Sequence, residues 1–392
     1  MFKNKTILII ALIAVVNALG YGIIIPVLYS YSIRFGLSDF QNGLLFAIFS
    51  FCQFIATPII GRLSDKYGRK PLLVVSLIGT ALSFFMTAFA PSALFLFLAR
   101  ALDGITAGNI PVAAAVISDS TDMKDRARGF GIIGAAFGFG FVFGPAIAAF
   151  TVGINAALPF IIAGVVSVIA VFITWVFLPE TNKHIGQVVH GKLFDFPKLA
   201  MAIRDEYTGM TLLISFLFSL AFGMFIFGFQ PFSVKIMGLS SNEISVIFTI
   251  FGVVGLITQA FLLGKFTKRF GEKRMFIVSL ALTGIAFIGI FVTTTLPFFI
   301  ATSILLSFGN SFLNPLVQTI LSKETDVKSQ GTIQGINASY VSIGMTLGPI
   351  IGGLLATYYI PFPFLAGGII ILICFFLAFR IKLSVRHKEH LF

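Results

Sequence analysis

Twelve long apolar runs, separated by short polar connections, constrain this chain more than any other feature of its sequence. Each run holds about 20 residues, the length that an α-helix needs to cross the hydrocarbon core of a bilayer. The connections hold nearly all the charge of a chain that is 57% hydrophobic and 11% charged. The sequence therefore predicts an all-α membrane protein with twelve transmembrane helices, with centres near Ala14, Phe51, Ala81, Gly104, Gly138, Val168, Phe222, Gly252, Ala281, Phe308, Ile343 and Ile371.

The basic residues are distributed as in a multi-pass protein of the inner membrane. The net charge is +12, and all but three of the 27 Lys and Arg residues lie in the termini or in alternate connections. Cytoplasmic connections of membrane proteins are enriched in Lys and Arg. We therefore expect both termini in the cytoplasm, with membrane lipids as partners and no nucleic acid.

An internal repeat divides the chain into two halves. One glycine and proline pattern recurs 204 residues later, where Gly131, Gly140, Gly144 and Pro145 are followed by Gly335, Gly344, Gly348 and Pro349. The segment 118–121 matches 322–325 at the same offset, and Gly61 and Gly68 match Gly264 and Gly271 at 203. A match at one period along the chain indicates a duplicated unit. We expect two pseudo-symmetric halves, 1–178 and 208–392, joined by a cytoplasmic linker at 179–207, with a short basic tail at the end.

Two parallel six-helix halves are typical of secondary transporters, which bind substrate between the halves and alternate its access. The sequence holds no phosphate-binding loop, metal-ligand cluster or nucleophile elbow. We therefore expect a monomeric transporter of a small molecule, with no enzymatic activity, no metal and no cofactor. A proton gradient, rather than ATP, is the expected energy source.

The stretch from Gly61 to Pro71 is a charged connection between two apolar runs. Gly61 and Gly68 would permit close backbone approach and a left-handed turn. Asp65 could cap a helix, and the guanidinium of Arg69 could form a forked pair with a carboxylate. We predict a tight turn at the membrane face. Its charges either latch that face or only anchor and orient the connection.

Arg100 and Asp103 are charged residues inside the fourth run, predicted about 12 and 16 Å from its start at Ser92. Each ion costs about 2.5–3.5 kcal/mol at the centre of a membrane helix, so both should face each other or a cavity. Their spacing of three residues places them on one helix face. Two interpretations remain open, namely a structural ion pair and a proton-binding site.

Neutral polar side chains at the depth of the apolar runs are candidates for the substrate pocket. They are Asn17, Gln53, Gln259, Asn310, Asn314, Gln318 and Asn337. Three of them step by four residues along the tenth run and form one stripe. Asn109 is left out, because nine residues of ideal helix place it about 180° from Arg100. A mostly apolar pocket with scattered amides suits an amphipathic or aromatic compound.

Four motifs resemble those of the major facilitator superfamily, in particular its twelve-helix drug–proton antiporters and their tetracycline exporters. Gly61-x-x-x-Asp65-x-x-Gly68-Arg69-Lys70 is similar to motif A, and Arg100-Ala-Leu-Asp-Gly104 with Gly108 is similar to motif B. The run from Gly131 to Pro145 resembles motif C, which is associated with antiporters. Leu178-Pro179-Glu180-Thr181 resembles the segment that ends helix 6 in this branch.

The resemblance implies roles for individual residues. Asp65 would face the start of helix 11, and Arg69 would pair with an acid at the end of helix 4, here Asp119. These contacts would hold the cytoplasmic side closed. The motif B arginine, Arg100, is implicated in proton handling, so Asp103 becomes the expected coupling residue.

The chain also departs from the tetracycline exporters, since Asn17 and Ser83 stand where they carry acids in helices 1 and 3. We expect proton-coupled efflux of a small lipophilic or amphipathic, drug-like compound. Two alternatives are a sugar or metabolite transporter working by symport or facilitated diffusion, and a sensor that has lost transport.

Overall fold

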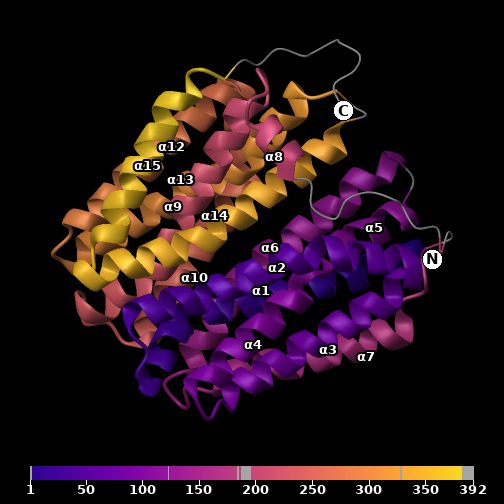
Figure 1. Ribbon diagram of the computed structural model, residues 1–392, viewed down its shortest axis with the longest axis horizontal. Helices are drawn as coiled ribbons and strands as arrows, with labels where there is room; N and C mark the ends of the chain where they lie inside the picture. Colours follow the sequence, from indigo (N-terminus) through magenta and orange to yellow (C-terminus); the bar gives the residue numbers. More distant parts are fainter. Residues whose placement is uncertain (1, 122, 183–184, 187–195, 327–328, 382–392) are drawn as a thin grey trace. The chain divides into compact units, whose positions relative to one another are not determined.

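The computed structural model describes residues 2–121, 123–182, 185–186, 196–326 and 329–381, and every regular element in these ranges is helical. Residues 183–184 and 187–195 of the predicted linker and the basic tail beyond Ile381 lie outside the described residues. The elements in chain order are α1 (Phe2–Ser32), α2 (Asp39–Tyr67), α3 (Arg69–Ala88), α4 (Ala93–Thr106), α5 (Ile110–Ser120), α6 (Met123–Thr151), α7 (Leu158–Phe177), α8 (Phe196–Ala202), α9 (Gly209–Lys235), α10 (Ser241–Ile257), α11 (Leu263–Phe270), α12 (Glu272–Val292), α13 (Leu296–Glu324), α14 (Gln330–Tyr358) and α15 (Phe362–Ala378) (Figure 1).

Eleven helical segments of the described chain are long and apolar enough to cross a membrane. The shorter apolar helix α15 holds 17 residues and contains the last predicted centre, Ile371. Each of the other predicted centres lies in one of the eleven segments. The prediction of an all-helical membrane protein with about twelve spans is therefore confirmed.

The chain folds into two compact units. Unit 1 consists of Met1–Ser38, Ile48–Phe194 and Leu239–Thr249, and unit 2 of Asp39–Ala47, Asp195–Gly238 and Ile250–Phe392. The first residues of α2 thus belong to unit 2, and the first residues of α10 belong to unit 1. The boundaries predicted from the sequence, at 178 and 208, stay a prediction.

The two units have matching internal packing. In unit 1, α1 packs against α6 and α7, while α3 packs against α7 and α4. In unit 2, α9 packs against α14 and α15, while α12 packs against α15 and α13. Each pair in unit 1 has its counterpart about 200 residues later, so the repeat in the sequence is also a repeat in the packing (Figure 1).

The cores of the two units differ in their side chains. Aliphatic residues from α1, α3 and α5, such as Ile13, Leu77 and Val116, form the core of unit 1. Aromatic rings dominate in unit 2, where the ring centroids of Phe229 and Phe299 lie 5.1 Å apart. Part of the large phenylalanine content therefore packs inside a helix unit, and the rest is exposed on its surface.

The turn that we predicted over 61–71 is confined to Gly68. Helix α2 continues through Gly61 to Tyr67, and α3 begins at Arg69, so only Gly68 separates them. Gly68 has a φ of +103°, which favours glycine, whereas Gly61 lies inside the helix with open space around it. The second copy is built alike, because Gly271, with a φ of +81°, alone separates α11 from α12.

Two long helices contain non-α segments that the sequence analysis did not predict. A 3₁₀ segment, Ala107–Asn109, joins α4 to α5, and a π-helical segment, Thr258–Leu262, joins α10 to α11. The π segment contains Gln259, one of the predicted pocket residues. Such interruptions change which side chains share a helix face, because the rotation per residue differs from that of an α-helix.

Candidate functional site

The two charged side chains of α4 form a buried ion pair in unit 1. Nη1 of Arg100 contacts Oδ2 of Asp103, and the two side chains are 2% and 9% exposed. Ser92 begins the helix, as predicted, and its hydroxyl accepts a hydrogen bond from the backbone N–H of Phe95. The spacing of three residues explains why one helix can make this pair.

Three neighbouring helices surround the pair with aromatic and polar groups. The guanidinium carbon of Arg100 lies 4.4 Å from the ring centroid of Phe49 on α2, a cation–π contact. Tyr21 on α1 packs against Phe49, with centroids 5.8 Å apart. Ser83 on α3 lies beside Asp103, and its hydroxyl donates to the backbone oxygen of Thr80 at 2.8 Å. Nε of Arg100 is buried without a hydrogen-bond partner in the described part of the chain.

The glycines of the motif that carries this pair bring α2 against α4. A Cβ at Gly104 would lie 2.9 Å from Cβ of Cys52, and one at Gly108 would lie 3.1 Å from the backbone nitrogen of Thr57. Contacts this short leave no room for a side chain. The glycines therefore hold Phe49 and its helix close to the charged pair.

Asn17 pairs with the residue that ideal helix geometry excluded. Its Nδ2 donates to Oδ1 of Asn109 at 3.0 Å, and Asn109 is fully buried. The 3₁₀ segment at Ala107–Asn109 departs from the rotation assumed in placing Asn109 opposite Arg100. Next to it, Nε2 of Gln53 donates to the backbone oxygen of Ala107 at 3.2 Å. These two predicted pocket residues thus lie beside one irregular segment of unit 1.

The other predicted pocket residues belong to unit 2. Asn337 is buried and accepts a hydrogen bond of 2.6 Å from the Ser215 hydroxyl, which joins α14 to α9. Asn310 is half-buried, with Oδ1 lacking a partner among the described residues. The remaining three, Gln259, Asn314 and Gln318, are exposed on the surface of unit 2. The substrate role of all seven stays a prediction.

Arg69 is the centre of a charged cluster at the junction of α2 and α3. Nη1 lies 2.6 Å from Oδ1 of Asp65 and also donates to the Ser64 hydroxyl at 2.6 Å. Nε lies 3.3 Å from Oδ2 of Asp119, near the end of α5. One guanidinium thus links three helices of unit 1, which its fork of five N–H donors makes possible.

Glu180 is a member of this cluster whose contacts the sequence analysis missed. Its carboxylate accepts the backbone N–H groups of Arg69 at 3.0 Å and Lys70 at 3.1 Å, at the start of α3. It also accepts those of Thr181 and Asn182. The first N–H groups of a helix have no partner inside the helix, and an anion there is favourable. Glu180 therefore caps α3 from 110 residues away.

The motif C glycines lie at two matching helix contacts. A Cβ at Gly144 would lie 2.8 Å from the backbone oxygen of Leu19, and one at Gly348 would lie 2.8 Å from Cα of Gly223. Gly140 and Gly344 are equally close to α1 and α9. The rings of Pro145 and Pro349 lie 3.0 Å from where a Cβ would stand at Gly22 and Gly223. Gly131 and Gly335 differ, because nothing lies within 4 Å of a Cβ there.

A buried acid at the end of α13 was also missed. Glu324 is 2% exposed, and Oε1 accepts a hydrogen bond of 3.0 Å from the Thr211 hydroxyl on α9. Oε2 has no hydrogen-bond partner in the described ranges. The adjacent Lys323 pairs instead with Glu272 at 2.6 Å. The match of 322–325 to 118–121 marked this helix end, but nothing in the sequence indicated burial.

No group of three or more His, Cys, Asp or Glu side chains within the described ranges is placed to hold a metal ion. The chemistry that unit 1 offers is instead that of a buried carboxylate, a buried guanidinium and hydrogen-bonding amides. These groups can bind and release protons or hold polar atoms of a small molecule.

The comparisons with known proteins identify the family. The Major Facilitator Superfamily model matches residues 10–240 and 211–391. The chain belongs to this superfamily. The tetracycline resistance protein, class H, of Pasteurella multocida is 31% identical over 383 residues, covering 92% of this chain and 91% of that protein. Multidrug resistance protein 2 of Bacillus subtilis (strain 168) is 32% identical, covering 95% and 94%.

Solved structures of this superfamily share the fold. A bacterial homolog of the human lysosomal transporter Spinster aligns with a TM-score of 0.79 at 19% identity, covering 99% of each chain. The human organic anion transporter MFSD10 aligns with a TM-score of 0.73 at 20% identity, covering 96% of this chain and 99% of that one. The protein is thus a multi-pass membrane transporter of the major facilitator fold.

Proposed function

We propose that this major facilitator protein exports a small lipophilic or amphipathic compound in exchange for protons. The observation that carries the proposal is the buried pair of Arg100 and Asp103 in an otherwise mostly apolar helix bundle. A charged residue inside a membrane-spanning helix bundle is costly, so such residues are kept mainly where function requires them. The tetracycline and multidrug resistance proteins among its relatives support a drug-like cargo.

In the proposed cycle, Asp103 carries the proton. A proton on Oδ2 would remove the charge-assisted hydrogen bond from Nη1 of Arg100. The guanidinium would then be held by the Phe49 ring and the helix packing around it. Loss of the proton would restore the pair. Asp103 therefore switches Arg100 between a paired and an unpaired state, which is the elementary event that coupling needs.

We further propose that the protein works as a monomer in the cytoplasmic membrane, with both termini in the cytoplasm. The distribution of Lys and Arg supports this orientation, because the basic residues gather in alternate connections. The Arg69 cluster, with its links among α2, α3 and α5, would then be at the cytoplasmic side.

Accumulation in intact cells tests the proposed transport. Cells without their own drug exporters would express the protein and take up a tetracycline, a quinolone or a lipophilic cationic dye. We expect lower accumulation of at least one of these compounds, and we expect a protonophore to abolish the difference. If none of them changes while uptake of a labelled sugar does, the protein is a metabolite transporter and the proposal fails.

A further inference from the structure

A shallow, open cavity of about 540 Å³ lies at the start of α12 in unit 2, separate from the buried pair of unit 1. Its lining comes from the end of α11, the first two turns of α12 and Phe379 just after α15. Two apolar spans, Ser241–Phe270 and Glu272–Val292, meet at Gly271. The cavity therefore lies where the apolar spans end, which is the level of lipid head groups.

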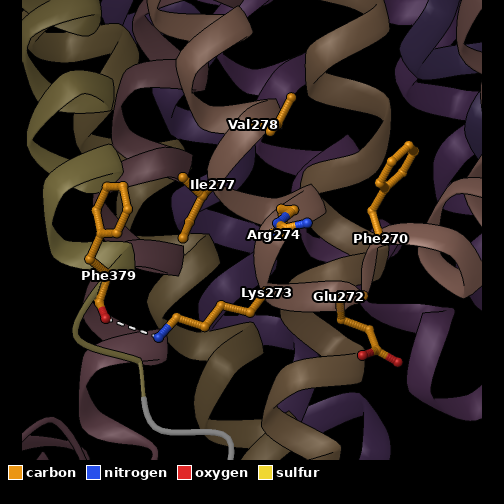
Figure 2. A pocket seen from close by; sticks show the side chains of 8 residues that line it. Phe270, Glu272, Lys273, Arg274, Ile277, Val278 and Phe379 are labelled. Carbon is orange, nitrogen blue, oxygen red and sulfur yellow. Dashed lines mark hydrogen bonds between the residues drawn. The ribbon is translucent and has the colours of Figure 1, made fainter.

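Basic side chains dominate the polar part of this cavity. Nζ of Lys273 donates to the backbone oxygens of Phe379 at 2.9 Å and Ile381 at 2.7 Å. Arg274 is exposed and has no hydrogen bond or ion pair among the described residues. Figure 2 shows Lys273 extending toward Phe379 and Glu272 pointing the other way, with Arg274 between them. Because Glu272 is paired with Lys323, Lys273 and Arg274 have no acidic partner among the described residues.

The first copy of the repeat indicates what the start of α12 binds, because the start of α3 is its counterpart in unit 1. Gly68 and Gly271 hold equivalent positions, each with positive φ, and each begins a helix. In unit 1, the carboxylate of Glu180 binds the first N–H groups of α3. The positions 203 and 204 residues after Glu180 are leucine and serine, so the second copy has no matching acid in its sequence. The start of α12 has the same positive helix end and an added pair of cations.

Apolar side chains beside these cations select the kind of anion. Phe270, Val278 and Phe379 line the cavity and are 42%, 43% and 56% exposed. A free phosphate ion would gain nothing from this surface, whereas the glycerol and acyl part of a lipid would cover it. Basic sites at the cytoplasmic ends of membrane helices suit anionic head groups.

We propose that this cavity binds an anionic phospholipid, with its phosphate on the Arg274 guanidinium and its acyl region on Phe270 and Val278. The α12 dipole and Lys273 add attraction from the same side. The assignment to the cytoplasmic leaflet rests on the proposed orientation of the chain, but the site itself does not depend on the direction or cargo of transport.

Native mass spectrometry in neutral detergent tests the proposal with phosphatidylglycerol as the probe and phosphatidylcholine as its neutral counterpart. We expect the wild-type protein to bind phosphatidylglycerol more tightly. Arg274→Gln removes charge-assisted hydrogen bonds, so its apparent affinity for that lipid should fall about tenfold. Arg274→Lys keeps the charge and should fall less. The exposed variant Val278→Glu, which adds a negative charge at the rim, should weaken binding independently.

Lys268→Gln is the matched control, because it removes one exposed charge from α11 at the same membrane face without touching the cavity. Its affinity should change less than about twofold, as expected for a surface charge screened by solvent. Wild-type affinity in Arg274→Gln, or an equal loss in Lys268→Gln, would overturn the site. Displacement of the lipid by millimolar inorganic phosphate would overturn its assignment to a lipid and indicate a free-anion site.

Discussion

Nε of Arg69 lies 3.3 Å from Oδ2 of Asp119, although fifty residues separate them in the chain. The same guanidinium reaches Asp65 in α2, across the break at Gly68. A partly exposed ion pair adds little on its own, but the pair with Asp119 ties the start of α3 to the end of α5. Arg69 is therefore the residue whose loss should loosen this end of unit 1.

We predict that Arg69→Ala increases accessibility on the side of this cluster. The side chains of Arg69, Asp65 and Asp119 are 13%, 36% and 30% exposed, so solvent weakens the pairs. A loss of about 1 kcal/mol in the stability of the closed state corresponds to about a fivefold increase in the ratio of open to closed protein. Cysteine labelling measures the accessibility of this side, in a background with Cys52 and Cys374 replaced.

Two reporter positions for this labelling follow from the glycine contacts. Gly131→Cys and Gly335→Cys report on one unit each, because a Cβ at either position meets nothing within 4 Å. Lys70→Ala is the control, since only its backbone N–H joins the cluster in the contacts of the described residues. Equal labelling rates in Arg69→Ala and Lys70→Ala would count against a latch and leave these charges as anchors of the connection.

The motif C glycines should separate into two classes on substitution. Gly344→Ala would place a Cβ 2.8 Å from the backbone nitrogen of Leu220, so we expect a loss of about 1–3 kcal/mol in unfolding free energy from overpacking. Gly335→Ala, nine residues earlier in α14, meets no atoms and should be neutral or stabilise the helix by up to about 1 kcal/mol. Thermal unfolding of the purified protein distinguishes them. Equal unfolding temperatures for Gly344→Ala and Gly335→Ala would mean that α14 can move away from α9 without cost.

Glu324 should reduce stability in the wild-type protein. Its carboxyl is buried, one oxygen has no partner among the described residues, and the electrostatic neighbour Asp205 is another acid. Glu324→Gln keeps an oxygen for Thr211 and removes the charge, so we expect it to raise the unfolding free energy by about 1–3 kcal/mol.

Glu272→Gln is the control for Glu324, because that acid already has Lys323 at 2.6 Å and is only partly buried. Losing a partly exposed pair should cost about 1 kcal/mol or less. The two substitutions should therefore shift the unfolding temperature in opposite directions. A lower temperature for Glu324→Gln would mean that the negative charge itself stabilises the end of α13.

The sequence predicted the helices well because about 20 apolar residues leave the chain few alternatives in a membrane. Ile371, for example, was placed in a span from hydropathy alone. Gly68 was also predicted as a turn residue, since glycine readily adopts a positive φ. The turn was predicted to be longer because Arg62 and Lys66 are charged. Both residues instead lie in the last turns of α2, since charge at a helix end does not stop the helix.

Side chains were harder to place wherever a helix departs from ideal geometry. Asn109 was excluded by counting 100° per residue, which fails across the 3₁₀ segment that contains it. Its partner Asn17 lies 92 residues away, a distance that no local pattern spans. Glu180 was recognised as part of a motif, but its contacts with α3 required the packing of α7 beside that helix.

The central claim is that Asp103 carries the coupling proton, and Asp103→Asn tests it most directly. Purified wild-type and variant proteins in lipid vesicles would be given an imposed pH gradient and a compound that the cell assay has identified as cargo. We predict that Asp103→Asn loses gradient-driven accumulation and keeps exchange of labelled for unlabelled cargo, because Asn can hold a hydrogen bond but no exchangeable charge. Accumulation at the wild-type level in Asp103→Asn would contradict the account and leave Arg100 and Asp103 as a structural ion pair.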